Sequence, residues 1–233
     1  MTKVLCLSVY QNRNWPGTGI KTMIEIAKKL DISGIELMFS SFNELFLFSP
    51  SPQDIKWIRK LDYVSIHAPF EAVNSNTEMI QQLDRLNEIY NLIDAQVVVI
   101  HPTNLPPPKI LNKYTFAACT ENTKRRTTIS SLKKIFRKYP RLGLCIDVSH
   151  AYLQSEKETS KLIKTFQEKI VQIHMSGAHN GEDHLSLRGT SKRFLRSIIP
   201  IKNLDVPIII EEDITSPSIG DLRKEIKIVA SII

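Results

Sequence analysis

Six histidines are the residues of this 233-residue chain whose positions most directly indicate chemistry. All six stand at or just after the end of an apolar run of strand length, and none falls in a segment with helical periodicity. In chain order they are His67, His101, His150, His174, His179 and His184. Neutral imidazole is the commonest side-chain ligand of metals in proteins. Histidines that recur at one end of successive strands therefore indicate a metal site.

Carboxylates occupy equivalent places in the sequence. Glu121, Asp147 and Glu211 each end an apolar run, and His150 follows Asp147 closely enough for both side chains to reach the same side from one turn. Carboxylates buried without a cation are costly, so a cluster of them requires positive partners. A mixed set of His, Asp and Glu suits Zn²⁺ or Mn²⁺ better than Mg²⁺ or Ca²⁺.

Each of these residues, taken alone, has a simpler interpretation. A lone histidine at a strand end is more often a hydrogen-bonded core or loop residue, and a lone carboxylate such as Glu211 could cap the next helix. We expect His179 to be a plain loop residue of this kind. What favours a metal is that the same residue types recur at the ends of six consecutive strands.

The elements that must position these side chains alternate along the chain. Amphipathic periodicity predicts helices over Met79–Ile93, Thr127–Tyr139 and Ile219–Ile232. The strand candidates are rich in β-branched residues and nearly unbroken, as strands buried on both faces should be. They are Val4–Val9, Gly34–Met38, Tyr63–His67, Val97–His101, Phe116–Glu121, Leu142–Asp147, Ile170–His174 and Pro207–Glu211.

Eight such strands alternating with helices predict an α/β fold, a single (β/α)8 TIM barrel that takes residues 1–233 as one domain. Its βα loops are shortened, and the connection from His101 to Glu121 leaves room for a helix of two turns at most. An open doubly wound sheet is the alternative, although the glycine-rich motifs of nucleotide-binding loops are absent. In a barrel, the ends of all eight strands gather at the mouth that carries the active site.

Charge and cysteine content narrow the range of partners and of cellular locations. The 31 Lys+Arg against 24 Asp+Glu give a net charge of +7, which fits a polyanionic partner such as nucleic acid. No stretch approaches the ~18 apolar residues of a membrane span, and the first residues are typical of a strand rather than a signal peptide. Cys6, Cys119 and Cys145 lie far apart in apolar runs. We therefore expect buried reduced thiols without a disulfide, in a cytoplasmic protein without a membrane partner.

The strand-end motifs resemble a known family. HAP, HP, EN, DxxH, H, DHLSL and IE follow one another in this order from the third strand to the eighth, and together they resemble the xylose isomerase-like TIM-barrel superfamily. Within it they are most similar to the endonuclease IV type of apurinic/apyrimidinic endonuclease, AP endonuclease family 2. The resemblance runs from about Val4 to Asp213, and the segment CIDVSHAY is close to that family's pattern.

The resemblance implies up to three Zn²⁺ ions per chain, with Mn²⁺ as a possible substitute. The implied ligands of the first ion are His67 and His101, with Glu121 bridging to the second, and those of the second are Asp147, His174 and Glu211. The third is implied to have His150, His184 and Glu182 as ligands. Asp183 stands beside Glu182, and the family has Asp at this place. The resemblance implies cleavage of DNA 5′ to abasic sites, with Glu211 or Glu121 positioning or deprotonating the nucleophile.

Contacts to abasic or damaged DNA are expected from loops around the mouth. The residues expected to bind substrate are Phe70, Asn122, Lys124, Arg125, Arg126 and Arg188. Phe70 could be an apolar wedge or part of the core. The chain departs from the family at Ser40-Ser41-Phe42, where the family has an arginine, and at Lys124-Arg125-Arg126, which replaces a glycine-rich stretch.

A second function is a sugar or sugar-phosphate isomerase or epimerase, as in many members of the superfamily. Such an enzyme holds one metal through the equivalents of Glu121, Asp147, His174 and Glu211, and its substrate here would be a phosphorylated sugar. A barrel that binds metal and ligand without turnover is a third possibility. A one-metal isomerase does not need His67, His101, His150 and His184 together as ligands, so their presence favours phosphodiester hydrolysis.

Overall fold

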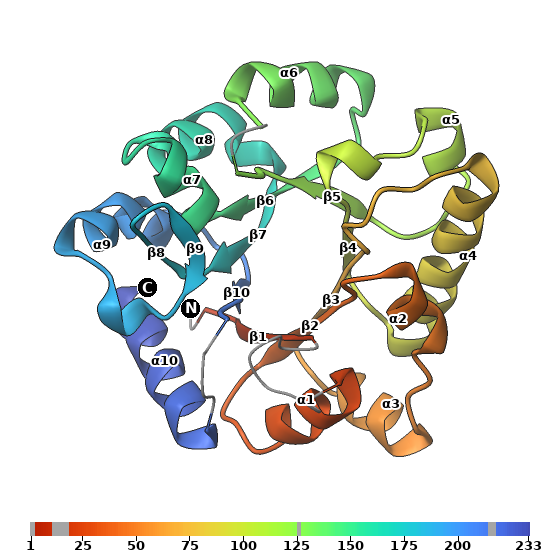
Figure 1. Ribbon diagram of the computed structural model, residues 1–233, viewed down its shortest axis with the longest axis horizontal. Helices are drawn as coiled ribbons and strands as arrows, with labels where there is room; N and C mark the ends of the chain where they lie inside the picture. The colour runs from red at the N-terminus through yellow and green to blue at the C-terminus, as the bar shows by residue number, and fades with distance from the viewer. Residues whose placement is uncertain (1–2, 11–18, 125–126, 214–217) are drawn as a thin grey trace.

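Eight parallel strands close into a barrel in the computed structural model, which describes residues 3–10, 19–124, 127–213 and 218–233 (Figure 1). Around the barrel their order is β1-β10-β7-β6-β5-β4-β3-β2, so that β10 pairs with β1 and closes the ring. The strands are β1 (Leu5–Val9), β2 (Gly34–Met38), β3 (Tyr63–His67), β4 (Val97–Val99), β5 (Ala118–Glu121), β6 (Gly143–Asp147), β7 (Ile170–Met175) and β10 (Ile208–Ile210). The predicted (β/α)8 barrel is confirmed, and the open sheet is wrong.

Helices surround the barrel on the outside, as Figure 1 shows. The α-helices are α1 (Ile20–Ala27), α2 (Phe42–Leu47), α3 (Pro52–Ile58), α4 (Asn76–Ile93), α5 (Pro108–Leu111), α6 (Ile129–Lys138), α7 (Val148–Gln154), α8 (Glu158–Phe166), α9 (Lys192–Ile198) and α10 (Ile219–Ile232). Short 3-10 turns are η1 (Pro102–Asn104), η2 (Gln167–Lys169), η3 (Leu187–Gly189) and η4 (Ile199–Asn203). Among the helices in the described ranges, none is long and apolar enough to cross a bilayer.

Local chemistry explains several of these boundaries. The longest helix, α4, begins where the Ser75 side chain accepts a hydrogen bond from the Glu78 amide, and it ends at Asp94, whose φ of 54° is left-handed. Strand β4 ends at Val99, two residues before the predicted end, because Pro102 has no N–H with which to continue the ladder. The connection that follows contains the 3-10 turn η1 and the one-turn helix α5, which agrees with the predicted limit of two helical turns.

Alternate residues of the strands face the inside of the barrel. Below the mouth, the interior is filled by Cys6, Tyr63, Val97, Val99, Cys119, Cys145 and Ile209, and the three cysteines there are free thiols. Side chains repeat with a period of two along a strand, so residues two positions further on point inward as well. On four of these strands those residues are His101, Glu121, Asp147 and Glu211. The strand period therefore places the candidate ligands at the open end of the barrel.

The hairpin between β7 and α9 is an element that the sequence did not lead us to expect. It consists of the antiparallel strands β8 (Gly177–His179) and β9 (Glu182–Leu185). Its turn is Asn180-Gly181, with φ angles of 49° and 84°. A two-residue hairpin turn with both φ values positive favours the Asn-Gly pair. His179 is exposed at the end of β8, which agrees with a loop residue outside the site.

The larger apolar core lies between the barrel and the helices, and helix α4 offers a matched test of it. Ile89 is fully buried there, whereas Ile80 on the same helix is 43% exposed. We expect Ile89→Ala to lower the free energy of unfolding by about 2–5 kcal/mol, because it leaves a cavity. Ile80→Ala should change it by no more than about 0.5 kcal/mol. Urea denaturation measures both, and equal losses would contradict this packing.

Candidate metal centre

A cavity of about 320 Å³ at the mouth of the barrel is lined by six of the predicted ligands, and Asp147 and His174 lie buried next to them. The six are His67, His101, Glu121, His150, His184 and Glu211. His67, Glu121 and Asp147 are the last residues of β3, β5 and β6, while His174 is the last but one of β7. His101 and Glu211 follow β4 and β10, His150 lies in the first turn of α7, and His184 lies in β9. Among the described residues, four overlapping groups of three side chains place their ligand atoms within 4.8 Å of one another.

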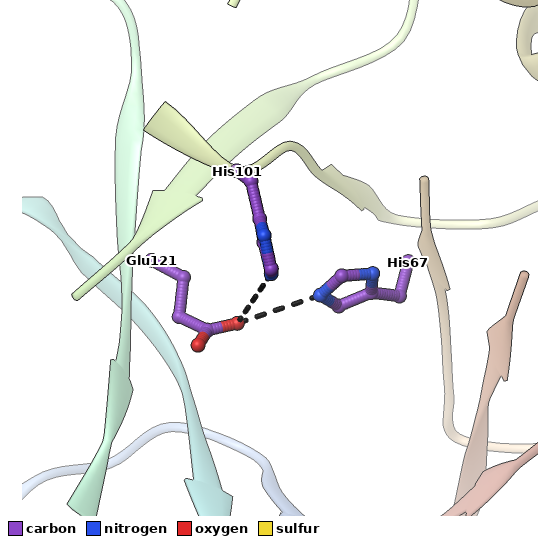
Figure 2. A group of neighbouring side chains, drawn as sticks. All are labelled: His67, His101 and Glu121. Atoms are coloured by element: carbon purple, nitrogen blue, oxygen red, sulfur yellow. Dashed lines mark hydrogen bonds and ion pairs between the residues drawn. The ribbon is translucent and has the colours of Figure 1, made fainter. Parts of the chain in front are cut away.

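The first group joins His67, His101 and Glu121. The Nε2 atoms of the two histidines lie 3.4 Å and 3.8 Å from the same carboxylate oxygen, Oε2 of Glu121. Figure 2 shows both imidazoles turned toward that oxygen from different strands. Nδ1 of His67 donates to the carbonyl oxygen of Ala68 at 2.8 Å, which leaves Nε2 free to bind a cation.

The second group lies deeper and is centred on His174. Nδ1 of His174 is 2.7 Å from Oε2 of Glu211 and 3.4 Å from Oε2 of Glu121. Asp147 is the residue paired with His174 in the β6–β7 ladder. Its Oδ1 accepts hydrogen bonds from the His150 amide and the Ser149 hydroxyl, both at 2.7 Å, and its Oδ2 remains for another partner.

Unsatisfied atoms test whether a cation fits here. Oδ2 of Asp147, Nδ1 of His174 and Oε2 of Glu211 are buried and have no hydrogen-bond partner. Buried polar groups are almost always hydrogen-bonded, so three such atoms in one group need an explanation. All three are lone-pair donors of the kind that Zn²⁺ and Mn²⁺ accept. The residues present therefore fit a divalent cation.

The third group contains His150 and His184. Nδ1 of His150 donates to the carbonyl oxygen of Asn122 at 3.0 Å, and Nδ1 of His184 lies 3.4 Å from the carbonyl oxygen of Glu211. Nε2 of each ring is thus left for a ligand role. On the same side, Oδ2 of Asp183 lies 3.4 Å from Nε2 of His150.

Asp183, rather than the predicted Glu182, is the carboxylate that faces this group. Glu182 is exposed, whereas Asp183 lines the cavity. Neighbouring side chains of a regular strand point to opposite sides. His184 has a φ of 55°, which breaks this alternation and lets Asp183 and His184 both line the mouth. Left-handed backbone costs a non-glycine residue about 1–2 kcal/mol, and such strain is concentrated at functional sites.

Burial and mutual contacts shift the protonation of these groups in different directions. Burial lowers the pKa of His101 to about 4, so this ring is neutral and ready to bind a cation at physiological pH. Burial alone would also lower the pKa of His150, but the Asp147 and Glu121 carboxylates raise it to about 10. Burial alone would raise the pKa of Glu121, but hydrogen bonds from neighbouring histidines hold it well below its usual range.

Two of the residues predicted to bind substrate lie at the cavity. Phe70 lines it, is 36% exposed, and stacks on His101 with ring centroids 6.1 Å apart. Lys124 lies at its edge, where Nζ is 3.3 Å from the carboxylate of Asp183. Arg125 and Arg126 fall outside the described residues.

The other two do not face the cavity. The side-chain amide of Asn122 is fully buried and exchanges two hydrogen bonds, of 2.8 Å and 2.9 Å, with the backbone of Asp147, so it joins β5 to β6. Arg188 turns away to α10, where it pairs with Glu225 at 2.5 Å and Asp221 at 3.1 Å. The polar atoms of Asn122 and Arg188 are thus engaged away from the cavity, and substrate binding by these two residues stays a prediction.

Three further residues at the site were missed in the sequence. Glu36 of β2 is fully buried, with Oε1 3.0 Å from Nε2 of His174. Tyr10 and Asp213 line the cavity, and the Tyr10 hydroxyl donates to Oδ1 of Asp213 at 2.8 Å. The signal available for Glu36 was a lone carboxylate in the apolar run GIELM, which needs a buried partner.

Comparison with known proteins identifies the fold and leaves the activity open. No family model and no curated protein matches the chain. A D-tagatose 3-epimerase-like protein matches with a TM-score of 0.70 and 18% identity over 98% of this chain and 96% of its own. Endonuclease IV from Thermus thermophilus matches with a TM-score of 0.70 and 17% identity, over 100% and 98%. A probable 3-DHS dehydratase from Bacillus anthracis gives 0.72 and 10%, over 97% and 98%. The chain thus has the fold of xylose isomerase-like TIM-barrel proteins.

The position of Asp183 predicts an asymmetry between two neighbouring carboxylates. We expect Asp183→Asn to lower the zinc content of the purified protein by about one equivalent, because it removes a charged oxygen beside His150. Glu182→Gln should leave the content unchanged, because that side chain is exposed. Elemental analysis of both variants measures this. Loss of zinc from the Glu182 variant alone would show that the hairpin is oriented differently.

The raised pKa of His150 predicts opposite effects of pH with and without metal. Its folded-state pKa of about 10 exceeds the value of about 6.5 in an unfolded chain, so between these values the folded state holds more protons. The contribution of His150 to the stability of the metal-free protein is therefore lost as pH rises through this window. A cation must displace that proton, so stabilisation by zinc should grow as pH rises.

Melting temperatures with and without zinc, at about pH 6.5 and about pH 8.5, measure this difference. The zinc-induced increase should be larger at the higher pH. His150→Gln should flatten the dependence, while the exposed His179→Gln should retain it. An increase that is equal or smaller at the higher pH would contradict the role given to His150.

Proposed function

We propose that this protein is a metal-dependent phosphodiester hydrolase that cuts DNA 5′ to abasic sites. The observation that carries the proposal is the convergence of three ligand groups, one around each of His101, His174 and His184, on one cavity. Glu121 belongs to the first two groups and Asp147 to the last two, so adjoining cations would share ligands. A one-metal enzyme has no use for this many imidazoles around one carboxylate cluster.

Zinc is the cation that suits the donor set best, with up to three ions per chain and Mn²⁺ as a possible replacement. The donors are imidazole nitrogens and carboxylate oxygens, a mixture typical of catalytic zinc sites. Ions held at this site would bind phosphate oxygens, generate a nucleophile from water and neutralise the leaving alkoxide. The cysteines lie below the mouth and are not among these groups.

Glu211 and Glu121 have the geometry of groups that handle the proton of the attacking water. Glu211 stands between two ligand groups, with Oε2 at 2.7 Å from His174 and Oε1 at 3.7 Å from His184. Glu121 contacts His150 through Oε1 at 2.9 Å and His67 through Oε2 at 3.4 Å. Each carboxylate is therefore held by histidines on two sides and can orient a water or accept its proton.

Two residues at the mouth can contact the nucleic acid. Phe70 presents a half-exposed ring beside His101, which can stack against or displace a base next to an abasic gap. Lys124 pairs with Asp183, and a cation that bound Asp183 would release this lysine for a phosphate.

The free buried thiols support a cytoplasmic location. The barrel with its βα loops acts as one domain in this proposal.

A sugar or sugar-phosphate isomerase or epimerase is the second candidate, and one observation favours it. The three unpartnered ligand atoms, on Asp147, His174 and Glu211, belong to one group rather than three. A single well-prepared site in a cavity of about 320 Å³ fits a phosphorylated sugar. This chemistry would use the metal to stabilise an enediolate.

A nicking assay separates the two functions. We expect the zinc-loaded protein to cut a duplex that bears a tetrahydrofuran abasic analogue, and EDTA to abolish the cut. Glu211→Gln should lower the cleavage rate at least ~100-fold, because it removes a group that acts on the nucleophile. His179→Gln, a change on the exposed hairpin, should cut like the wild type.

Metal analysis of the same preparation should give more than two zinc or manganese equivalents per chain. A firm value of one would refute the three-metal centre. If the protein also left the abasic duplex intact while interconverting a ketose and its epimer or aldose, the isomerase would replace the hydrolase as the function.

A further inference from the structure

A polar layer lies inside the barrel directly beneath the metal groups. It contains Ser65, Gln172 and Glu36, each of which precedes an inward-facing residue of the mouth by two positions. These three side chains are buried, as is Ser8, which pairs with Glu36 in the β1–β2 ladder. A buried carboxylate in such surroundings is costly and needs specific partners.

Glu36 has polar contacts with Ser65, Gln172 and His174. Its Oε2 accepts hydrogen bonds from the Ser65 hydroxyl at 2.8 Å and from the Gln172 amide at 2.7 Å. Its Oε1 is buried without a hydrogen-bond partner, and the nearest imidazole nitrogen, Nε2 of His174, lies 3.0 Å away. One oxygen of the carboxylate is thus fixed by neutral donors, and the other is left for the imidazole.

The amide of Gln172 is oriented from below. The Tyr63 hydroxyl donates to Oε1 of Gln172 at 2.8 Å, so the oxygen of this amide faces Tyr63 and its nitrogen faces upward. That nitrogen lies 2.7 Å from Glu36 and 3.0 Å from Nε2 of His174. The Gln172 amide can therefore donate to either of them.

The two nitrogens of the His174 ring face different partners. Nε2 faces Glu36 and Gln172, while Nδ1 faces Glu211 at 2.7 Å. If Nε2 carries the proton, Nδ1 offers its lone pair to a cation. If Gln172 instead donates to Nε2, the proton moves to Nδ1 and blocks that position. A cation bound at Nδ1 leaves Nε2 to carry the ring proton, for which Glu36 is the nearest carboxylate acceptor.

We propose that Glu36 is a positioning residue that accepts the Nε2–H of His174 and thereby presents Nδ1 to the cation held with Glu211. The inference rests on the metal centre of the proposed function. A carboxylate behind a metal-bound histidine fixes its tautomer and raises its basicity, and loss of such a partner lowers metal affinity about 10–100-fold. Glu36 supplies this support from β2, which β1 and β10 separate from β7.

Zinc affinity, measured by competition with a chromophoric chelator, tests the role of Glu36. We expect Glu36→Gln, which retains size and polarity, to weaken the tightest zinc site at least ~10-fold. Glu36→Leu should weaken it further, because Gln172 is then the only partner of Nε2. Unfolding of the metal-free variants is measured in parallel, so that loss of affinity is separated from loss of fold.

The double variant Glu36→Leu with Gln172→Leu distinguishes positioning from a structural role. Without the Gln172 amide, Nε2 loses the donor that favours the proton on Nδ1, so the double variant should bind zinc more tightly than Glu36→Leu alone. A purely structural Glu36 predicts that the second deletion makes binding worse. In the zinc-loaded wild type, ¹H–¹⁵N correlation spectra should show the His174 proton on Nε2.

The outcomes separate this inference from the function on which it rests. A wild type that binds no zinc would overturn the metal centre and the inference with it. A wild type that binds zinc with an affinity unchanged by Glu36→Gln, or a His174 proton found on Nδ1, would overturn the role of Glu36 alone.

Discussion

Buried negative charge is the constraint on which this structure depends. Glu36, Glu121, Asp147 and Glu211 are all less than a tenth exposed, and each would cost several kcal/mol if left without a partner. The protein meets this cost with imidazoles rather than with lysine or arginine. Histidines change charge and can give up their protons to an incoming cation. The same groups that hold the metal-free barrel together therefore form a site that is ready for metal.

The barrel positions this charge through two simple geometric rules. Parallel strands bring all carboxyl ends to one mouth, and the period of two along each strand directs alternate residues inward. The register between adjacent strands sets which mouth residues lie side by side, since Asp147 pairs with His174 and Met38 with His67. A shift of one residue in any of these ladders would turn a ligand toward the helices.

Most of the fold could be predicted because its signals are local. Strands β2 and β3 have the predicted bounds, and the predicted ligands apart from Glu182 come together at the mouth, since strand ends are visible in the sequence. What was missed depends on contacts between residues far apart in the sequence. Glu36 finds its partner on β7, Arg188 pairs with α10, and Asn122 bonds the backbone of the next strand. Asp183 faces the site instead of Glu182 because His184 has a left-handed backbone, which the residue types in the sequence do not indicate.

The β8–β9 hairpin has a consequence for how such proteins can diversify. Asp183 and His184 are carried by this small insertion and not by a barrel strand, whereas the His174 group is built on β5, β6, β7 and the end of β10. In the proposed centre the third ligand group thus depends on a loop, while the other two are built on the barrel. Exchange of one hairpin would be enough to remove that third group and leave the scaffold unchanged.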